Sequence, residues 1–252
     1  MTVTYQPRIL WPQNPARLPD NLANAVTIPS GLSREHVRAP MFVDAAGMMA
    51  AAQNDIQRPT GWTMGTTNGR VARIFEPHFA NQAAQWRRVS PPQLSAGAHG
   101  PCTYRFTGGD LFLDLTLRIY ILNTCMPDPN EPLTIEIFAA AYSHELLHVL
   151  DEVEIVCKWL TQQAHADQDL AATLGASRPY VFGAGRQTAI EIEQNFPRHI
   201  QTYLRDHLHG PWVRETNRRN GLRDTPDEYQ RVDARIQELR ARLHNLHPAP
   251  AR

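Results

Sequence analysis

The clearest hydrophobic pattern in the chain is a strict alternation of apolar and polar side chains near its middle. Aliphatic residues occupy every second position there, namely Leu111, Leu113, Leu115, Leu117, Ile119 and Ile121. A period of two over this length predicts a β-strand, or a bent hairpin, with one buried face. Residues 103–107 are its predicted pairing partner, joined to it through Gly108-Gly109-Asp110.

Helical patterns lie on both sides of this strand. Residues 133–163 contain many apolar side chains and no glycine or proline, which predicts one long helix. An alanine-rich segment predicts a short helix at residues 43–57, and another helix is predicted at residues 71–88, broken by Pro77. Prolines recur through residues 1–60 without clear periodicity, so we expect an extended arm there.

The last predicted helix has a distinct beginning and one apolar edge. Thr225-Pro226-Asp227-Glu228 combines a Thr cap, a proline at the first helical position and a Glu at the third, which is a capping box. Apolar residues then recur at spacings of three and four: Tyr229, Val232, Ile236, Leu239, Leu243 and Leu246. We expect this edge to dock on the chain's own domain, with self-association or binding of a carrier protein as alternatives.

These patterns together predict an α+β fold that is mostly helical, with a small antiparallel or mixed sheet over the long helix. We expect a proline-rich arm over residues 1–69, packed on a catalytic domain that spans residues 70–210. A separate C-terminal helix is expected at residues 224–247.

Composition and charge point to neither nucleic acid nor a membrane as a partner. The chain has 25 Lys and Arg against 25 Asp and Glu, so its zero net charge gives no indication of nucleic-acid binding. No segment reaches transmembrane length, and residues 1–7 do not resemble a secretory signal. We therefore expect a soluble protein that is cytoplasmic or exported by a route that needs no such signal.

The most informative motif is His144-Glu145-Leu146-Leu147-His148, an HExxH segment inside the predicted long helix. Residues four apart stack on one face of a helix, so His144 and His148 can bind one metal ion. Glu145 lies about 100° round the helix from His144 and can reach a metal-bound water. Two ligands and a general base in this pattern are the core of a zinc hydrolase.

Zinc needs at least one more ligand from the protein. The best candidate segment is residues 186–196, a predicted helix in which Glu191 and Asn195 are four residues apart. Glu191 is placed to bind the metal while Asn195 bonds to a ligand histidine. Glu193 is an alternative, but it lies nearly opposite Glu191 on the helix, so only one of the two can face the metal.

Two acidic residues close to the motif are further alternatives. Asp151 lies seven residues after His144, on the same helix face, where it can bond to an imidazole or bind the metal. Glu154 lies six residues after His148, where aspzincin-like enzymes have an Asp. These positions leave the third ligand open among Glu191, Glu193, Asp151 and Glu154.

HExxH followed some tens of residues later by a Glu-xxx-Asp/Asn helix resembles the gluzincin branch of the zincin metallopeptidases. The resemblance covers about 75 residues. It implies a zincin-like fold with His144, His148 and Glu191 as zinc ligands and Glu145 as the base. Zincins also place an edge strand of their sheet over the active helix to hold extended substrate, and residues 111–123 have the matching position in the sequence.

The expected activity is zinc-dependent hydrolysis of a peptide bond, in which Glu145 activates a zinc-bound water. The oxyanion needs a further donor, for which His199 is the first choice, ahead of Tyr203, His207 and Tyr180. In size and motif layout the chain resembles the metallopeptidase toxins and effectors that bacterial injection machines deliver. The alternative is a zinc-stabilised or metal-free binding or adaptor protein without turnover.

Overall fold

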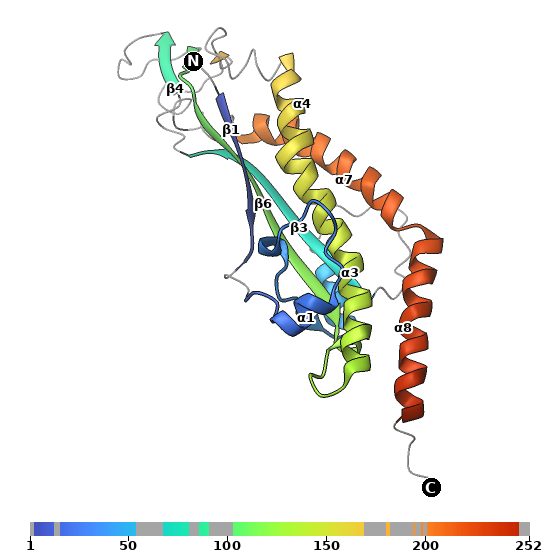
Figure 1. Cartoon of the computed structure of the whole chain (residues 1–252). Helices are drawn as coiled ribbons and strands as arrows, with labels where there is room; N and C mark the ends of the chain where they lie inside the picture. Colours follow the sequence, from blue (N-terminus) through green and yellow to red (C-terminus); the bar gives the residue numbers. More distant parts are fainter. Residues whose placement is uncertain are drawn as a thin grey trace. The chain divides into compact units, whose positions relative to one another are not determined.

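A computed structural model describes residues 3–12, 16–53, 68–80, 86–90, 103–168, 180–181, 194, 198 and 201–246 (Figure 1). The fold mixes helices and small sheets, which confirms the α+β prediction at that level. The described strands are β1 (Val3–Leu10), β2 (Met41–Val43), β3 (Gly69–Phe79), β4 (Trp86–Ser90), β5 (Thr103–Phe106), β6 (Gly109–Leu122) and β7 (Tyr180–Val181).

The described helices differ in length. The longer ones are α2 (Ala45–Gln53), α3 (Pro132–Glu154), α7 (Gly210–Arg223) and α8 (Pro226–Leu246). Shorter ones are α1 (Asp20–Ala25) and α4 (Thr161–Ala166), the 3-10 turns η1 (Arg34–His36) and η3 (Asn123–Cys125), and the π-helical segments η4 (Ile155–Leu160) and η5 (Arg205–His209). Helix α3 continues through η4 into α4, so the predicted long helix is confirmed.

The strands form two sheets. Strand β6 pairs with β1, β2 and β3 in a four-stranded sheet, in which β2 is parallel to β6 with Phe42 opposite Ile121. Strands β4, β5 and β7 form a separate three-stranded antiparallel sheet. The inward residues of β6 are almost fully buried, as its alternating pattern predicts.

Three predictions about the strands are wrong. Residues 69–79 form β3 and not a helix, because Val71, Phe75 and Phe79 alternate onto a buried face and β6 supplies the backbone partners. Strand β5 pairs with β4 and β7 rather than with β6. Strand β6 is interior to its sheet, so its backbone groups bond to neighbouring strands and it cannot serve as the substrate-holding edge.

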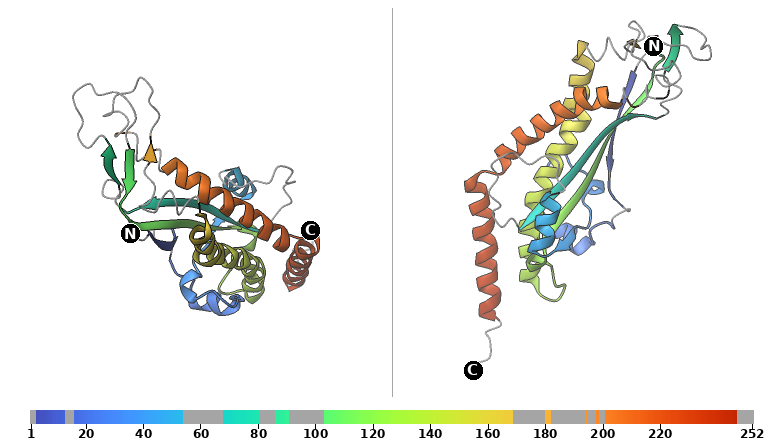
Figure 2. Two further views of the ribbon diagram at one scale, coloured as in Figure 1. Left: turned by 90° about the horizontal axis from the view of Figure 1, so that it is seen from above. Right: turned by 180° about the vertical axis from the view of Figure 1, so that it is seen from behind.

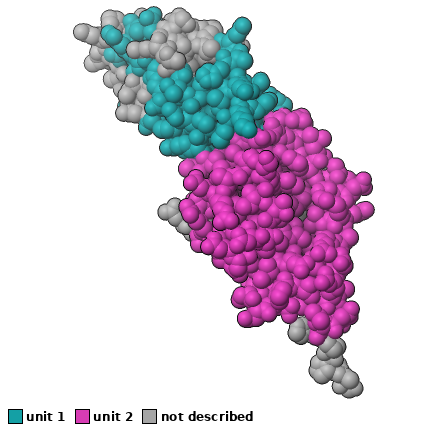
Figure 3. Space-filling model, viewed as in Figure 1, with its two compact units in different colours: residues 1–8, 75–115, 155–214 teal, residues 9–74, 116–154, 215–252 magenta. Residues whose placement is uncertain are grey.

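The chain divides into two compact units that are interleaved in sequence (Figure 3). Unit 1 comprises residues 1–8, 75–115 and 155–214, and unit 2 comprises residues 9–74, 116–154 and 215–252. The HExxH motif lies in unit 2. None of the described helices combines the length and the hydrophobicity that a membrane crossing needs.

In unit 2, helix α8 packs beside α3 (Figures 1 and 2). Thr225 caps α8 as predicted, since its hydroxyl accepts a hydrogen bond from the Glu228 N–H at 3.3 Å. Ile236 and Leu239, from the apolar edge of α8, are fully buried. The middle of the apolar edge therefore docks on the chain's own helix, as expected, whereas Leu246 at its end is exposed.

Candidate metal centre

The HExxH motif occupies the middle of α3, whose buried face carries Phe138, Tyr142 and Leu146. Because the helix is regular there, its geometry brings His144 and His148 to one face, with their ring centres 5.1 Å apart. Both imidazoles are buried, with 7% and 5% of their surface exposed. Burial of two imidazoles requires polar partners, and those partners come from other elements.

The principal partner is Asp224, in the short link between α7 and α8. Its Oδ1 atom lies 3.0 Å from His148 Nε2 and 3.5 Å from His144 Nε2. The two Nε2 atoms are 3.4 Å apart. Asp224 thus completes a triangle of potential ligand atoms, and the three residues form a group that could hold a metal ion among the described residues.

These distances fit a tetrahedral ion. Ligands bonded at about 2.0–2.2 Å to a tetrahedral zinc are separated from one another by roughly 3.3–3.6 Å. The three measured separations, 3.0, 3.4 and 3.5 Å, lie at or near that range. The Asp224 Oδ1 atom is also buried without a hydrogen bond of good geometry to any described residue, which a cation would satisfy.

The charges in the triangle stabilise one another. Burial disfavours the ionised Asp224, but interactions with His144 and His148 outweigh burial and hold its pKa well below the ordinary value. Burial likewise lowers the pKa of His144, yet Asp224 and the charge of Glu145 produce a net rise. The carboxylate of Asp224 therefore stays ionised beside the two imidazoles, as a metal ligand must.

His148 is held from its other ring nitrogen. Its Nδ1 atom lies 3.2 Å from Oδ1 of Asn220 in α7. The same amide oxygen accepts a hydrogen bond from Arg73 Nη2, in β3, at 3.1 Å. Nδ1 of His144, in contrast, is buried without a partner among the described residues.

Glu145 points away from solvent and against the first residue of β3. Only 4% of its surface is exposed, and burial raises its pKa, an effect that the charges of His148, His144 and Arg73 partly oppose. A Cβ atom on Gly69 would lie 2.8 Å from Glu145 Oε1 and 2.7 Å from its Cγ. The absence of a side chain at Gly69 therefore makes room for this carboxylate.

Tyr229, in the first turns of α8, brings a hydroxyl to the same cluster. Its ring centre lies 5.7 Å from that of His144, and its side chain hydrogen-bonds to Asp224. Burial, then the charges of Asp224 and Glu145, raise the pKa of Tyr229 well above the ordinary value. The phenol is therefore a proton donor across the whole physiological range.

Two of the predicted alternatives for the third ligand have other partners. Asp151 is bound by the guanidinium of Arg223, whose Nε and Nη2 atoms lie 2.9 and 3.2 Å from its two oxygens. Glu154 pairs with Arg219 at 2.9 Å. Neither residue belongs to the group of His144, His148 and Asp224 that could hold a metal ion in the described part of unit 2.

The remaining predicted site residues lie elsewhere. Glu191, Glu193 and His199 fall outside the described residues, so their predicted roles stay predictions. Tyr203 and His207 are stacked on each other with ring centres 4.1 Å apart, and both belong to unit 1. The side chain of Tyr180 is likewise not among the described parts of the structure.

Asp224 has no helical or strand spacing that relates it to the HExxH motif. The only sequence signal near it is the capping box that follows at Thr225 and places Asp224 at a helix junction. The packing of α8 on α3 is what brings this junction to the histidines. Acidic residues are common beside helix caps, so this signal alone does not distinguish Asp224 from other candidates.

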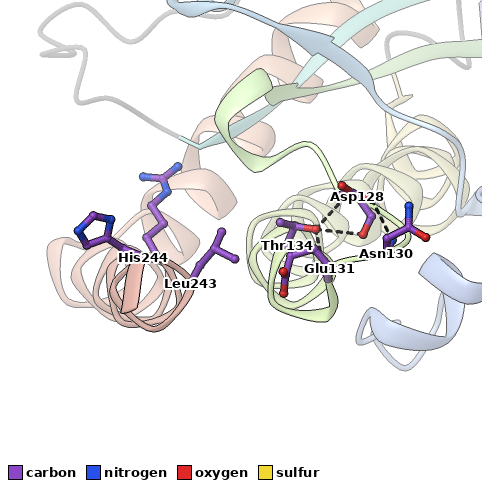
Figure 4. Close-up of a pocket in the computed structure, with 7 residues that line it drawn as sticks. Asp128, Asn130, Glu131, Thr134, Leu243 and His244 are labelled. Carbon is purple, nitrogen blue, oxygen red and sulfur yellow. Dashed lines mark hydrogen bonds between the residues drawn. The ribbon is translucent and has the colours of Figure 1, made fainter. Parts of the chain in front are cut away.

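A pocket in unit 2, at the beginning of α3, is lined by none of His144, His148 and Asp224 (Figure 4). It is lined by Asp128, Asn130, Glu131, Thr134, Arg240, Leu243 and His244. Its polar groups bond mainly to one another: the Thr134 hydroxyl donates to the Glu131 carbonyl and accepts from the Asp128 N–H, each at 2.7 Å. These bonds close the turn before α3, so we assign the pocket no role.

No family model matches the chain, and neither the curated proteins nor the solved structures contain a significant match to it.

Proposed function

We propose that this protein is a zinc-dependent metallopeptidase of the zincin type. The observation that carries the proposal is the convergence of His144, His148 and Asp224 beside the buried Glu145. This arrangement supports two imidazoles and one carboxylate as zinc ligands, with Asp224 in the role that the sequence resemblance gives to Glu191. Glu191 stays a candidate for an additional ligand.

Zinc at this site would polarise the substrate carbonyl and lower the pKa of a water molecule. Glu145 then acts as general base: it takes a proton from the attacking water and passes it to the leaving nitrogen of the amide. Burial raises the pKa of this carboxyl, which favours its uptake of the proton from the attacking water. Tyr229 is a described hydroxyl donor at the cluster and joins His199 as a candidate to stabilise the oxyanion.

The expected substrate is a peptide or protein, and delivery as an injected bacterial effector or toxin stays part of the proposal on the strength of size and motif layout. Because α8 buries Ile236 and Leu239 within unit 2, a carrier protein would contact other side chains of this helix. Capture of such a carrier is not required for catalysis in this proposal.

A second candidate is a structural zinc site in a binding protein without turnover. Structural sites are closed, whereas catalytic sites keep one position open to water. His144, Glu145 and His148 each expose 7% or less of their surface, which favours a closed site. The intact Glu145 opposes this candidate, because a structural site needs no base.

Metal content tests the site itself. We expect about one zinc per chain in the purified protein and its loss in His144→Ala and Asp224→Ala, since each variant removes one of three ligands. Asp227→Ala is the matched control, because Asp227 lies on the same segment but is exposed. Zinc retained in Asp224→Ala would remove Asp224 from the ligand set.

Hydrolysis tests the function. Against a denatured-protein or peptide-library substrate, Glu145→Gln should lose at least about a hundredfold in rate, as expected when a general base is removed, while it keeps its zinc. Zinc bound by both proteins without any Glu145-dependent cleavage would favour the structural site.

A further inference from the structure

We propose that Arg73 and Asn220 are positioning residues that fix the protonation pattern of His148, so that its Nε2 lone pair faces the metal position. This inference rests on the proposed metal centre and adds two residues to it. Both belong to unit 2, on β3 and α7 respectively. Neither touches the metal position, and both act through His148.

The first step concerns the Asn220 amide. Its oxygen and nitrogen look alike in shape, so their assignment depends on their neighbours. An Arg guanidinium can donate hydrogen bonds but cannot accept them. The atom 3.1 Å from Arg73 Nη2 must therefore be the amide oxygen.

The second step concerns the imidazole. The same amide oxygen lies 3.2 Å from His148 Nδ1 and can only accept, so Nδ1 must carry the proton. A neutral imidazole with a proton on Nδ1 has its lone pair on Nε2. Nε2 is the atom that faces His144 Nε2 and Asp224 Oδ1.

The third step concerns what holds Arg73 in place. Its Nε atom lies 2.8 Å from Oε1 of Glu152, in α3, and the two side chains expose only 6% and 1% of their surfaces. A buried ion pair of this kind does little for net stability but fixes geometry. Glu152 and His148 lie on the same helix, α3. The contacts therefore run from Glu152 through Arg73 and Asn220 and return to α3 at His148.

Zinc affinity of purified protein, measured by competition with a chromophoric chelator, tests the inference. Asn220→Leu removes the acceptor and should weaken zinc binding by about 10- to 100-fold, the usual effect of losing a partner of a ligand histidine. Asn220→Asp keeps an oxygen acceptor and should bind zinc within about threefold of wild type. Asn217→Leu is the matched control, because Asn217 lies one turn earlier on α7 and its Oδ1 has no partner among the described residues.

A second readout, taken on variants that keep the wild-type circular dichroism spectrum, is the Nδ1–H signal of His148 in long-range ¹H–¹⁵N spectra of the zinc-loaded protein. It should exchange slowly in wild type and in Asn220→Asp, and rapidly in Asn220→Leu. If Asn220→Leu fails to fold, Arg73→Met combined with Glu152→Met replaces the ion pair by apolar groups and should weaken zinc binding roughly tenfold.

The outcomes separate this inference from the proposed function. Wild-type protein that binds no zinc would remove the metal centre and this inference with it. Zinc bound by wild type and lost in His148→Ala, but bound equally well by Asn220→Leu, would leave the centre standing and overturn the positioning role.

Discussion

At the scale of single residues, the site depends on groups that are constrained from several sides. His148 has Asn220 at one ring nitrogen and Asp224 at the other, with 3.2 Å and 3.0 Å separations. Glu145 is confined by the backbone of Gly69. Such constraints remove rotamer freedom before any ligand binds, which is what preorganisation of a site requires.

Gly69 provides a test of this confinement. In Gly69→Ala the new Cβ would lie 2.8 Å from Glu145 Oε1 and 2.9 Å from Ile121 Cδ1, so the carboxylate must move. We expect hydrolysis to fall by about a hundredfold, the effect of a displacement near 1 Å at a reacting group, with zinc content unchanged. Gly221→Ala is the control, since no atom lies within 4 Å of its added Cβ. Wild-type activity in Gly69→Ala would contradict the assigned position of Glu145.

A single carboxylate also gives a testable pH dependence. Hydrogen bonds from Arg218, opposed by burial and assisted by Arg219, lower the pKa of Glu215 from 4.5 to about 2. A lowered pKa in the folded state stabilises the protein above the unfolded value, and that contribution is lost as the pH falls from 4.5 towards 2.

Urea unfolding of wild type and Glu215→Gln between pH 7 and pH 2 measures this effect. The variant lacks the titrating carboxylate, so the stability advantage of wild type should shrink on acidification. A difference between the two proteins that stays constant over the whole range would show that Glu215 titrates normally.

At the scale of elements, local sequence decides the secondary structure of some segments, and pairing with distant segments decides it for others. The long apolar segment without glycine or proline predicts α3, and the capping box and regular apolar spacing predict α8. Residues 71–88 predict a helix broken by Pro77, but the part up to Phe79 is strand β3, in which proline is tolerated because β3 pairs on one side only among the described strands. The hydrogen bonds between β3 and β6 stabilise the strand conformation of this segment.

The docking of α8 on α3 gives a prediction at this scale. Ile236 is fully buried, so Ile236→Ala should lower the free energy of unfolding by about 2–5 kcal/mol. Leu246 lies on the same helix with 64% of its surface exposed. Leu246→Ala should therefore change the free energy of unfolding by less than about 0.5 kcal/mol. Denaturant unfolding of both variants measures this contrast, and equal effects would mean that α8 is not docked.

At the scale of the whole molecule, the candidate centre joins segments that are distant in sequence. The histidines come from α3, Asp224 from the α7–α8 link, and all three lie in unit 2. An unfolded chain does not hold these groups together, so zinc should bind the folded state in strong preference. In the proposed centre, the bound metal would thereby couple the segments that carry the ligands.

Zinc removal should therefore destabilise the protein. A protein that binds zinc only in its folded state is stabilised by about 2.7 kcal/mol when the free zinc concentration is a hundred times the Kd. For a chain of this size that corresponds to a rise in Tm of roughly 5–11 °C, measured by calorimetry with and without a chelator. Asp224→Ala should show no such rise, and a rise equal to that of wild type would place the zinc elsewhere.

The sequence by itself determined the elements with long, consistent patterns and the part of the site that lies within one helical turn. His144, Glu145 and His148 come together because the rise and twist of an α-helix put them there, whatever surrounds the helix. Asp224, Asn220, Arg73 and Gly69 could not be found in this way. Their relation to the motif is set by the pairing of β3 with β6 and the packing of α8 on α3, interactions between segments whose spacing in the sequence carries no periodic signal.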